Sequence, residues 1–453
     1  MPQVPVPPDA QLWPISATLR DAGRLQIAGV DVVSLAEEYG TPLYLYDEAT
    51  ISAQCRAYHD AIASRWPHAA VAYAGKAYLS PALCQLLARE DIELDVVSAG
   101  ELGIALAAGF SAARIHLHGN HKPDGELALA LERGVGRIVV DSLEELERIE
   151  ALAGSRGTPA TIWLRVNPEI AAATHTHIQT GHSASKFGLA LEGELWEAAD
   201  RSARSPWLDL IGLHAHVGSQ IRDTSPIAEV SRALVRLAAQ IRARSGVTIH
   251  ELSPGGGLAV AYTPNEESPS VDAYADAIAN ALHEETTRFD FPAPRLIVEP
   301  GRSIVARAGV ALYSVGSRKE RPGGRVILAV DGGMGDNPRP ALYDAAYHAA
   351  LARRMHDPGE ETVSVVGRYC ESGDFLTDAV RLPRAGRGDL IAIPVSGAYQ
   401  VSMASNYNGI PRPAVVFLRE GSARLVRRRE TLEDLLRTDL GWSREDVGIH
   451  ADD

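Results

Sequence analysis

Short β-prone apolar runs alternate with amphipathic helical segments between residues 70 and 300. Eight runs are predicted as strands, at residues 70–74, 93–97, 114–118, 137–140, 161–166, 209–217, 248–252 and 295–299. Segments with helical spacing, such as 81–89, 100–108 and 142–153, fall between them. This alternation predicts an α/β fold with a parallel sheet, and eight repeats predict a closed (β/α)8 TIM barrel. A doubly wound open sheet is the alternative, weakened because no glycine fingerprint follows the first strand.

The pattern changes after residue 302. Short apolar runs at 309–315, 325–330, 361–366 and 389–394 are bounded by Gly, Pro and Asp, which is typical of an all-β domain. The earlier runs 25–33 and 43–46 are candidates to join it, which makes the β domain discontinuous. We therefore expect a barrel domain at 47–301, a β domain at 20–46 plus 302–430, and an extended N-terminal arm at 1–19.

Polar or glycine-rich residues follow every predicted barrel strand, from Lys76 after the first to Glu299 and Arg302 at the eighth. In a barrel these strand ends meet on one face, where active sites lie. Strand alternation also places Ala72, Ala74 and Lys76 on one side of the first strand. Small and polar residues on that side predict a barrel whose interior holds a ligand.

Lys76 ends an otherwise apolar segment. A buried ammonium tends to lose its proton, and a neutral, nucleophilic lysine is what a Schiff base with an aldehyde cofactor requires. The alternative is a strand-end lysine that extends to water.

Three consecutive glycines, Gly255, Gly256 and Gly257, follow the seventh strand and offer backbone amides to a phosphate. A flexible turn is the alternative, but Ser219 and Gly301 end neighbouring strands and can bind the same phosphate. A carboxylate such as that of Glu299, placed beside a pyridine nitrogen, keeps that nitrogen protonated and makes the ring a strong electron sink.

The composition limits the partners. A chain of 453 residues with a formal charge of -14 predicts two soluble domains and argues against nucleic acid or an anionic membrane as partner. No secretory signal and no apolar stretch long enough to cross a bilayer are recognised. Three widely spaced cysteines form no metal-binding or disulfide pattern, which fits a reducing cytoplasm.

Several motifs together resemble the fold-type III pyridoxal-phosphate-dependent decarboxylases, and among them the diaminopimelate decarboxylases. They cover roughly residues 25 to 420, and they are YAGKAYLS (73–80), DVVSAGEL (95–102), HGNHK (118–122), HTHIQTG with SKFGL (175–189), GLHAHVGSQI (212–221), PGGGLAVAY (254–262), VEPGRSIVA (298–306), NPRPALY (337–343), CESGD (370–374) and GAYQVSMASNYNGIPRP (397–413).

The resemblance implies pyridoxal 5'-phosphate as cofactor. It implies that Lys76 binds the cofactor aldehyde, that His216 packs on its ring and that Glu299 pairs with its pyridine nitrogen. Phosphate and neighbouring contacts are implied for Ser219, Gly255, Gly256, Gly257, Gly301, Arg302 and Tyr399.

The resemblance further implies decarboxylation of meso-2,6-diaminopimelate to L-lysine. The residues implied to bind this substrate are Arg302, Arg339, Tyr343, Glu371 and Tyr399. Cys370 is implied to protonate the carbon that loses carbon dioxide. Cys370 and Glu371 are implied to reach the site of a neighbouring subunit, so a homodimer is expected.

Two alternatives stay open. The first is a decarboxylase of another diamino acid, such as D-ornithine, D-lysine or arginine, and an unusual segment at Ile178-Gln-Thr-Gly loosens the inference about substrate. The second is a non-catalytic homologue that binds the cofactor or a partner enzyme. Two arginines for a remote carboxylate speak against the first, and intact Lys76, Cys370 and Glu299 speak against the second.

Overall fold

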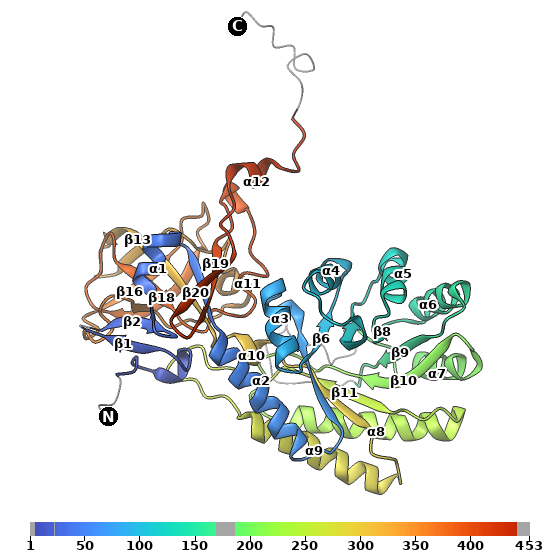
Figure 1. The fold of residues 1–453 in the computed structure, drawn as a ribbon. Coiled ribbons are helices and arrows are strands. Elements are labelled where there is room, and N and C mark those ends of the chain that lie inside the picture. The colour runs from blue at the N-terminus through green and yellow to red at the C-terminus, as the bar shows by residue number, and fades with distance from the viewer. Residues whose placement is uncertain (1–4, 22, 169–185, 442–453) are drawn as a thin grey trace, which may run out of the picture.

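The computed structural model describes residues 5–21, 23–168 and 186–441, which form a barrel joined to a β-rich part (Figure 1). Eight parallel strands close the barrel in the order β10-β11-β12-β5-β6-β7-β8-β9. Their bounds are β5 (Ala69–Ala74), β6 (Glu93–Val96), β7 (Ile115–Leu117), β8 (Arg137–Val140), β9 (Ala160–Arg165), β10 (Leu208–His214), β11 (Glu251–Gly255) and β12 (Arg295–Val298). The predicted TIM barrel is therefore confirmed.

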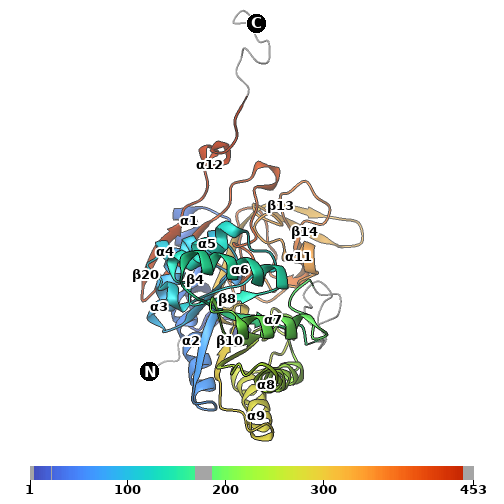
Figure 2. The same ribbon diagram turned by 90° about the vertical axis from the view of Figure 1, so that its right-hand side faces the viewer.

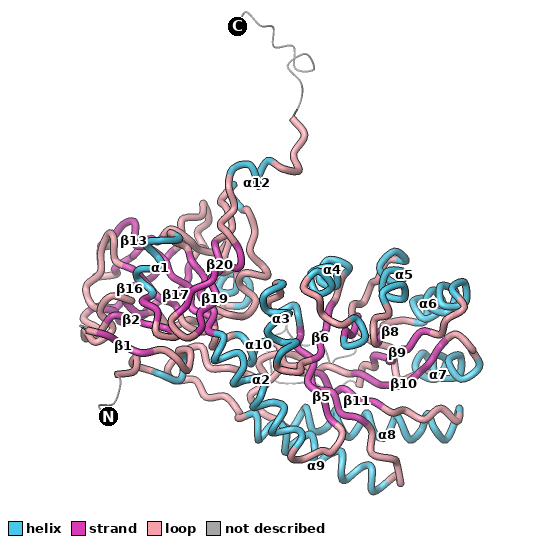
Figure 3. The backbone as a smooth tube through the Cα atoms, viewed as in Figure 1, coloured by secondary structure: helices cyan, strands magenta, loops and turns pink. Residues whose placement is uncertain are grey.

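Helices surround the strands on the outside of the barrel (Figure 3). They are α2 (Glu48–Ala63), α3 (Pro81–Arg89), α4 (Ala99–Ala107), α5 (Asp124–Arg133), α6 (Leu143–Arg156), α7 (Glu194–Arg204), α8 (Ser225–Ser245) and α9 (Val271–Arg288). Helix α3 shows why they form: the Ser80 side chain caps it by accepting from Leu83 N, and Pro81 fits its first turn. It buries Leu83, Leu86 and Leu87 toward the core.

The seventh barrel strand lies later in the chain than predicted. We expected 248–252, but β11 extends to Gly255, which pairs with Val298 of β12 after an irregularity in register. Pro254 and Gly255 do not end the strand because β10 pairs with β11 as far as Ser253 and β12 pairs with Gly255, beyond the point where local propensity falls.

The β domain is discontinuous, as predicted. Its main sheet has the order β17-β16-β14-β13-β4-β19-β20. Strand β4 (Leu43–Asp47), which precedes the barrel, pairs with β13 (Gly309–Glu320) and β19 (Ala414–Arg419) from the other end of the chain. The remaining elements are β14 (Val326–Val330), β15 (Ala350–Leu351), β16 (Glu361–Val366), β17 (Phe375–Leu382), β18 (Leu390–Ile393), β20 (Ser422–Arg427), α10 (Arg302–Val305), α11 (Arg339–Tyr343) and α12 (Leu432–Leu436).

The N-terminal segment differs from expectation in two ways. The run 25–33 does not join the main sheet; β1 (Thr18–Arg20), β2 (Arg24–Ile27) and β3 (Val30–Asp31) form a separate sheet, followed by α1 (Val32–Tyr39). The described part of the predicted arm also packs against the rest of the chain, because Leu12 and Trp13 are fully buried in the core. At the other end of the described chain, α12 projects away from both domains (Figure 2).

Side chains fill part of the barrel interior, so a ligand has room at the carboxyl ends of the strands. Trp163 packs in the filled part with Ala72, Val139 and Ile297, and a Cβ on Gly212 would lie 2.2 Å from the Trp163 ring. The part of the chain that the structure describes contains no helix with the length and hydrophobicity of a membrane span.

Candidate active site

A cavity of about 1050 Å³ lies at the carboxyl ends of the barrel strands, where the β domain covers them. Most of the predicted site residues line it together. They are Lys76, His216, Ser219, Gly256, Gly257, Glu299, Gly301, Arg302, Arg339, Tyr343 and Tyr399. Gly255 is not among the lining residues, because it ends β11 and its carbonyl accepts from Glu299 N.

Lysine is rare in this chain, which narrows the choice of a Schiff-base residue to four positions. Lys122 is fully buried and donates to three acceptors, and Lys319 is the last residue but one of β13 in the β domain. Lys186 is exposed next to Phe187, a residue of the cavity wall. Lys76 is the one lysine among the described cavity-lining residues.

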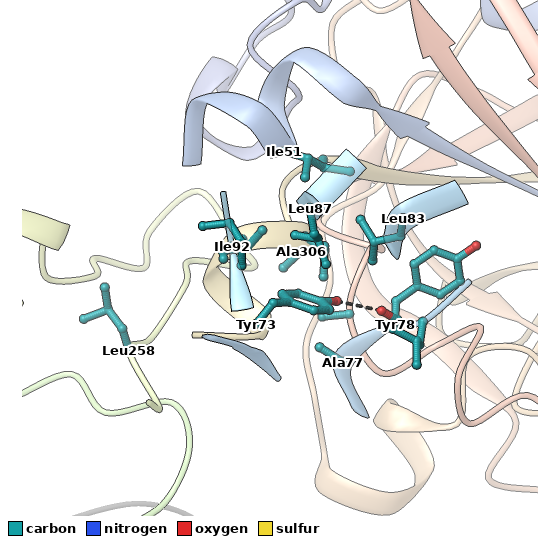
Figure 4. Close-up of a cluster of buried hydrophobic side chains, with 14 of the residues drawn as sticks. Ile51, Tyr73, Ala77, Tyr78, Leu83, Leu87, Ile92, Leu258 and Ala306 are labelled. Atoms are coloured by element: carbon teal, nitrogen blue, oxygen red, sulfur yellow. Dashed lines mark hydrogen bonds between the residues drawn. The ribbon is translucent and has the colours of Figure 1, made fainter. Parts of the chain in front are cut away.

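The turn that carries Lys76 is held from both sides. The Tyr73 hydroxyl donates to Tyr78 O at 2.8 Å (Figure 4). This hydrogen bond spans the short 3₁₀ helix Gly75–Ala77, which contains Lys76. Tyr399 N donates to Ala77 O at 2.8 Å from the β domain. The expectation of a buried lysine is wrong: the side chain is exposed to the cavity, since it leaves the strand after Ala74.

Glu299 is buried beneath the cavity and accepts a hydrogen bond of 2.7 Å from Ser253 Oγ. A second hydrogen bond of 2.9 Å joins it to His214 Nε2. Burial alone raises the pKa of Glu299, but the charges of His214 and His118 and these two hydrogen bonds bring it well below its usual value. Glu299 is therefore an ionised carboxylate at neutral pH.

Asp95 and His118 lie beside Glu299 and were not predicted. His118 Nε2 is 3.7 Å from both Asp95 Oδ1 and Glu299 Oε1. Burial and the Glu299 charge raise the pKa of Asp95 well above its usual value, whereas burial lowers that of His118. His116, His118 and Glu299 offer ligand atoms within 4.8 Å of one another, but Glu299 already accepts from Ser253.

His216 presents a neutral imidazole to the cavity. Burial, followed by the positive charges of Lys76 and Arg165, lowers its pKa well below the ordinary value. Gly256 N donates to His216 Nδ1 at 3.4 Å, so the ring is held against the glycine turn. A neutral ring can lie on an aromatic ligand without adding charge.

The glycine turn, Gly255 to Gly257, packs too closely against neighbouring backbone to carry side chains. A Cβ on Gly256 would lie 2.0 Å from Glu299 O, and a Cβ on Gly257, with φ of +105°, would lie 2.2 Å from Gly218 O. The amides of Gly257 and Gly301 donate to no described residue. These free donors fit a phosphate. With Lys76 for an aldehyde and ionised Glu299 for a pyridine nitrogen, the cavity fits pyridoxal 5'-phosphate.

Two arginines enter the same cavity. Arg302 donates to Tyr262 Oη at 2.6 Å and to Ser219 Oγ at 2.9 Å, and its buried Nε has no hydrogen-bond partner among the described residues. Arg339 donates to Tyr347 Oη, and its guanidinium carbon lies 4.5 Å from the centre of the Tyr262 ring. Two cations with free donors can bind a carboxylate.

Tyr262 ends the PGGGLAVAY motif, but the sequence assigned it no role. Asp95, His118 and Arg165 were missed as well, although each stands at or next to the carboxyl end of a barrel strand. Their position at or next to the carboxyl end of a strand was the sequence signal that could have identified these three residues as part of the site.

Cys370 and Glu371 are not among the lining residues of this cavity. Both are exposed: Cys370 N donates to Asn408 Oδ1 at 2.9 Å, and Tyr407 Oη donates to Glu371 Oε1 at 2.6 Å. A single chain therefore does not bring them to Lys76. The His175–Gly181 part of the motifs lies outside the described residues.

Comparison with known proteins agrees with this geometry. Residues 48–306 match the family described as pyridoxal-dependent decarboxylase, pyridoxal binding domain. The chain is 46% identical over 419 residues to the diaminopimelate decarboxylase of Bacillus subtilis, covering 92% of this chain and 95% of that one.

Solved structures are similar over comparable lengths. The diaminopimelate decarboxylase of M. jannaschii in complex with L-lysine has a TM-score of 0.88 and 35% identity, covering 94% of this chain and 98% of that one. The lysine/ornithine decarboxylase of Vibrio vulnificus in complex with cadaverine has a TM-score of 0.73 and 25% identity, covering 85% and 97%.

Proposed function

The chain belongs to the diaminopimelate decarboxylases, pyridoxal 5'-phosphate-dependent enzymes that convert meso-2,6-diaminopimelate into L-lysine and carbon dioxide, and we propose how its residues divide this work. The observation that carries the assignment is that two buried arginines, Arg302 and Arg339, enter the cavity that holds Lys76 and ionised Glu299. A substrate with an amino-acid group at one end and a carboxylate at the other can reach the cofactor site at Lys76 with the first group and the two arginines with the second.

The cofactor would be held at three points. Lys76 would bind the aldehyde, Glu299 would accept from the protonated ring nitrogen, and His216 would cover a ring face. Gly256, Gly257 and Gly301 would hold the phosphate, with Ser219, Gly255, Arg302 and Tyr399 at that end. When bound, pyridoxal phosphate supplies an electron sink for the pair released as the bond from Cα to the carboxylate breaks.

The substrate is oriented by its far end. Arg302, Arg339 and Tyr343 bind the remote carboxylate, and Tyr399 lies between this group and the phosphate end. Because Arg339 is fixed by Tyr347, the carboxylate is bound at a set distance from Lys76. The amine of Lys76 lines the same cavity and would hold the cofactor aldehyde when no substrate is bound.

The proton that replaces carbon dioxide comes from a second copy of the chain. We infer a homodimer because Cys370 and Glu371 are exposed and lie outside the cavity of their own chain. In the dimer the Cys370 thiol protonates the substrate carbon and Glu371 accepts from the remote ammonium.

The domain limits are proposed in the same way. Residues 47–301 form the cofactor-binding domain, and 20–46 with 302–430 form the β domain that carries Arg339 and Cys370. The family match at 48–306 supports the first limits. Free thiols at Cys55 and Cys84 support a cytoplasmic location.

The test is a panel of purified diamino acids scored for carbon dioxide. The three stereoisomers of 2,6-diaminopimelate are compared with D-ornithine, D-lysine and L-arginine. We expect release from the meso isomer, none with Lys76→Ala, and wild-type release with the matched control Lys319→Ala. Preference for a substrate without a remote carboxylate would support another diamino-acid decarboxylase, and no release from any substrate would support a non-catalytic homologue.

A further inference from the structure

We propose that Tyr262 is the positioning residue that fixes Arg302 and Arg339 relative to each other and so selects substrates by their remote carboxylate. This inference rests on the proposed carboxylate-binding role of the two arginines. Tyr262 lies in the segment that follows the glycine turn, and it is 4% exposed.

One tyrosine side chain contacts both arginines through different parts. Its hydroxyl accepts from Arg302 Nη1 at 2.6 Å. Its ring lies 4.5 Å from the guanidinium carbon of Arg339, within the range of a cation–π contact. Arg302 begins α10 at the end of the barrel, whereas Arg339 begins α11 in the β domain. Tyr262, a residue of the barrel domain, therefore links two cations that lie on separate helices after the last barrel strand.

The tyrosine is itself held firmly. Tyr262 N donates to Glu266 Oε2 at 2.8 Å, and Tyr262 O accepts from His348 N at 3.2 Å. Tyr347 packs edge-on against the ring at 5.1 Å, and Tyr347 also accepts from Arg339. Contacts on the backbone, the ring edge and the hydroxyl leave this side chain one position.

The arrangement determines which donors stay available for a ligand. Arg302 uses one N–H of Nη1 on Tyr262 and one N–H of Nη2 on Ser219, so three of its five N–H donors, including the buried Nε–H, are not used by these two bonds. Arg339 lies against the Tyr262 ring, which restricts its guanidinium to one orientation. A remote carboxylate that binds both guanidinium groups must therefore lie at one position in the cavity. A substrate without a remote carboxylate gains no binding energy from this arrangement of Arg302 and Arg339.

Tyr262→Phe tests the hydroxyl and Tyr262→Leu tests the ring. In Tyr262→Phe we expect the KM for meso-diaminopimelate to rise roughly 10- to 100-fold, the range for losing a hydrogen bond to a charged group, with kcat changed less than about threefold. Tyr262→Leu should raise KM further because Arg339 loses its ring contact. Tyr46→Phe removes another buried hydroxyl, which donates to Gly397 O at 2.9 Å, and serves as the control with wild-type KM.

Equilibrium binding supplies a readout that a general loss of stability would not produce. By calorimetry with the holoenzyme, affinity for L-lysine, which keeps the remote carboxylate, should fall roughly tenfold or more in Tyr262→Phe. Affinity for cadaverine, which has no carboxylate, should stay unchanged. Equal losses for both ligands, or wild-type KM in Tyr262→Phe, would overturn the proposal. If Tyr262→Leu does not fold, Tyr262→Phe decides alone. A wild-type protein inactive on meso-diaminopimelate would refute the proposed function instead.

Discussion

Replacing Lys122 by methionine should destabilise the barrel strongly, although Lys122 does not line the cavity. Its Nζ is fully buried and donates to Glu145 Oε1 at 2.6 Å, and to Gly119 O and Val139 O at 2.7 Å each. These bonds hold the loop after β7, which forms part of the cavity wall, against β8 and α6. Lys122→Met keeps an unbranched side chain, one heavy atom shorter, but removes all three N–H donors.

The magnitude follows from the burial of both partners. Removing one member of a buried ion pair costs about 3–5 kcal/mol, because the other charge stays buried without compensation. Burial already raises the pKa of Glu145, and the Lys122 charge opposes that rise. Without Lys122 this pKa rises further above its unfolded value, so the folded state takes up a proton as the pH falls. The loss should thus be larger at pH 8 than at pH 6.

Urea unfolding followed by tryptophan fluorescence measures the effect. Taking a slope of about 2–3 kcal/mol/M, the midpoint of Lys122→Met should fall by roughly 1–2 M. Lys319→Met, at an exposed lysine, should change stability by less than about 0.5 kcal/mol. The double variant Lys122→Met/Glu145→Gln should recover part of the loss, because no charge stays buried. If Lys122→Met is as stable as Lys319→Met, or if the double variant is less stable than Lys122→Met, the buried Lys122–Glu145 pair does not stabilise the barrel in this way.

Three further predictions concern Arg339, which is proposed to bind the remote carboxylate, Gly256 in the glycine turn, and Glu93 at the start of β6. Arg339→Ala should raise the KM for meso-diaminopimelate roughly 10- to 100-fold and increase relative activity on D-lysine, as measured by carbon dioxide release; unchanged selectivity would contradict it. Gly256→Ala should weaken pyridoxal phosphate binding, measured by absorbance titration, because its Cβ would lie 2.0 Å from a backbone carbonyl; wild-type affinity would disprove the tight turn. Burial raises the pKa of Glu93, but hydrogen bonds and charges from His116 and Arg295 lower it to about 2. The ionised Glu93 side chain therefore stabilises the folded state at pH values above the unfolded pKa of this group, and the stabilisation is lost as the pH falls toward 2. Glu93→Gln should remove that part of the acid dependence in a thermal-shift series, and an identical acid profile would argue against it.

The barrel could be predicted because its signals are local. Strand and helix periodicity placed all eight strands, and polar strand ends placed Lys76, His216 and Glu299 on one face. The helix at 81–89 has the predicted bounds, since Ser80 and Pro81 are strong signals for a helix start. The boundary of β11 could not be read locally, because pairing with two neighbouring strands sets it.

The environment of each side chain could not be predicted from spacing. Lys76 was expected to be buried, yet its turn directs it into the cavity. Asp95 and His118 meet Glu299 only when the barrel closes and brings their strands side by side. Tyr262 contacts Arg339 across 77 positions of sequence, a pairing that depends on how the two domains pack.

Of the four lysines in this chain, one should carry the cofactor. Borohydride reduction of the holoenzyme fixes pyridoxal phosphate on the amine that binds its aldehyde, and peptide mass spectrometry then locates the modified residue. We expect modification of Lys76 alone. Modification of Lys122, Lys186 or Lys319, or of no lysine at all, would contradict it.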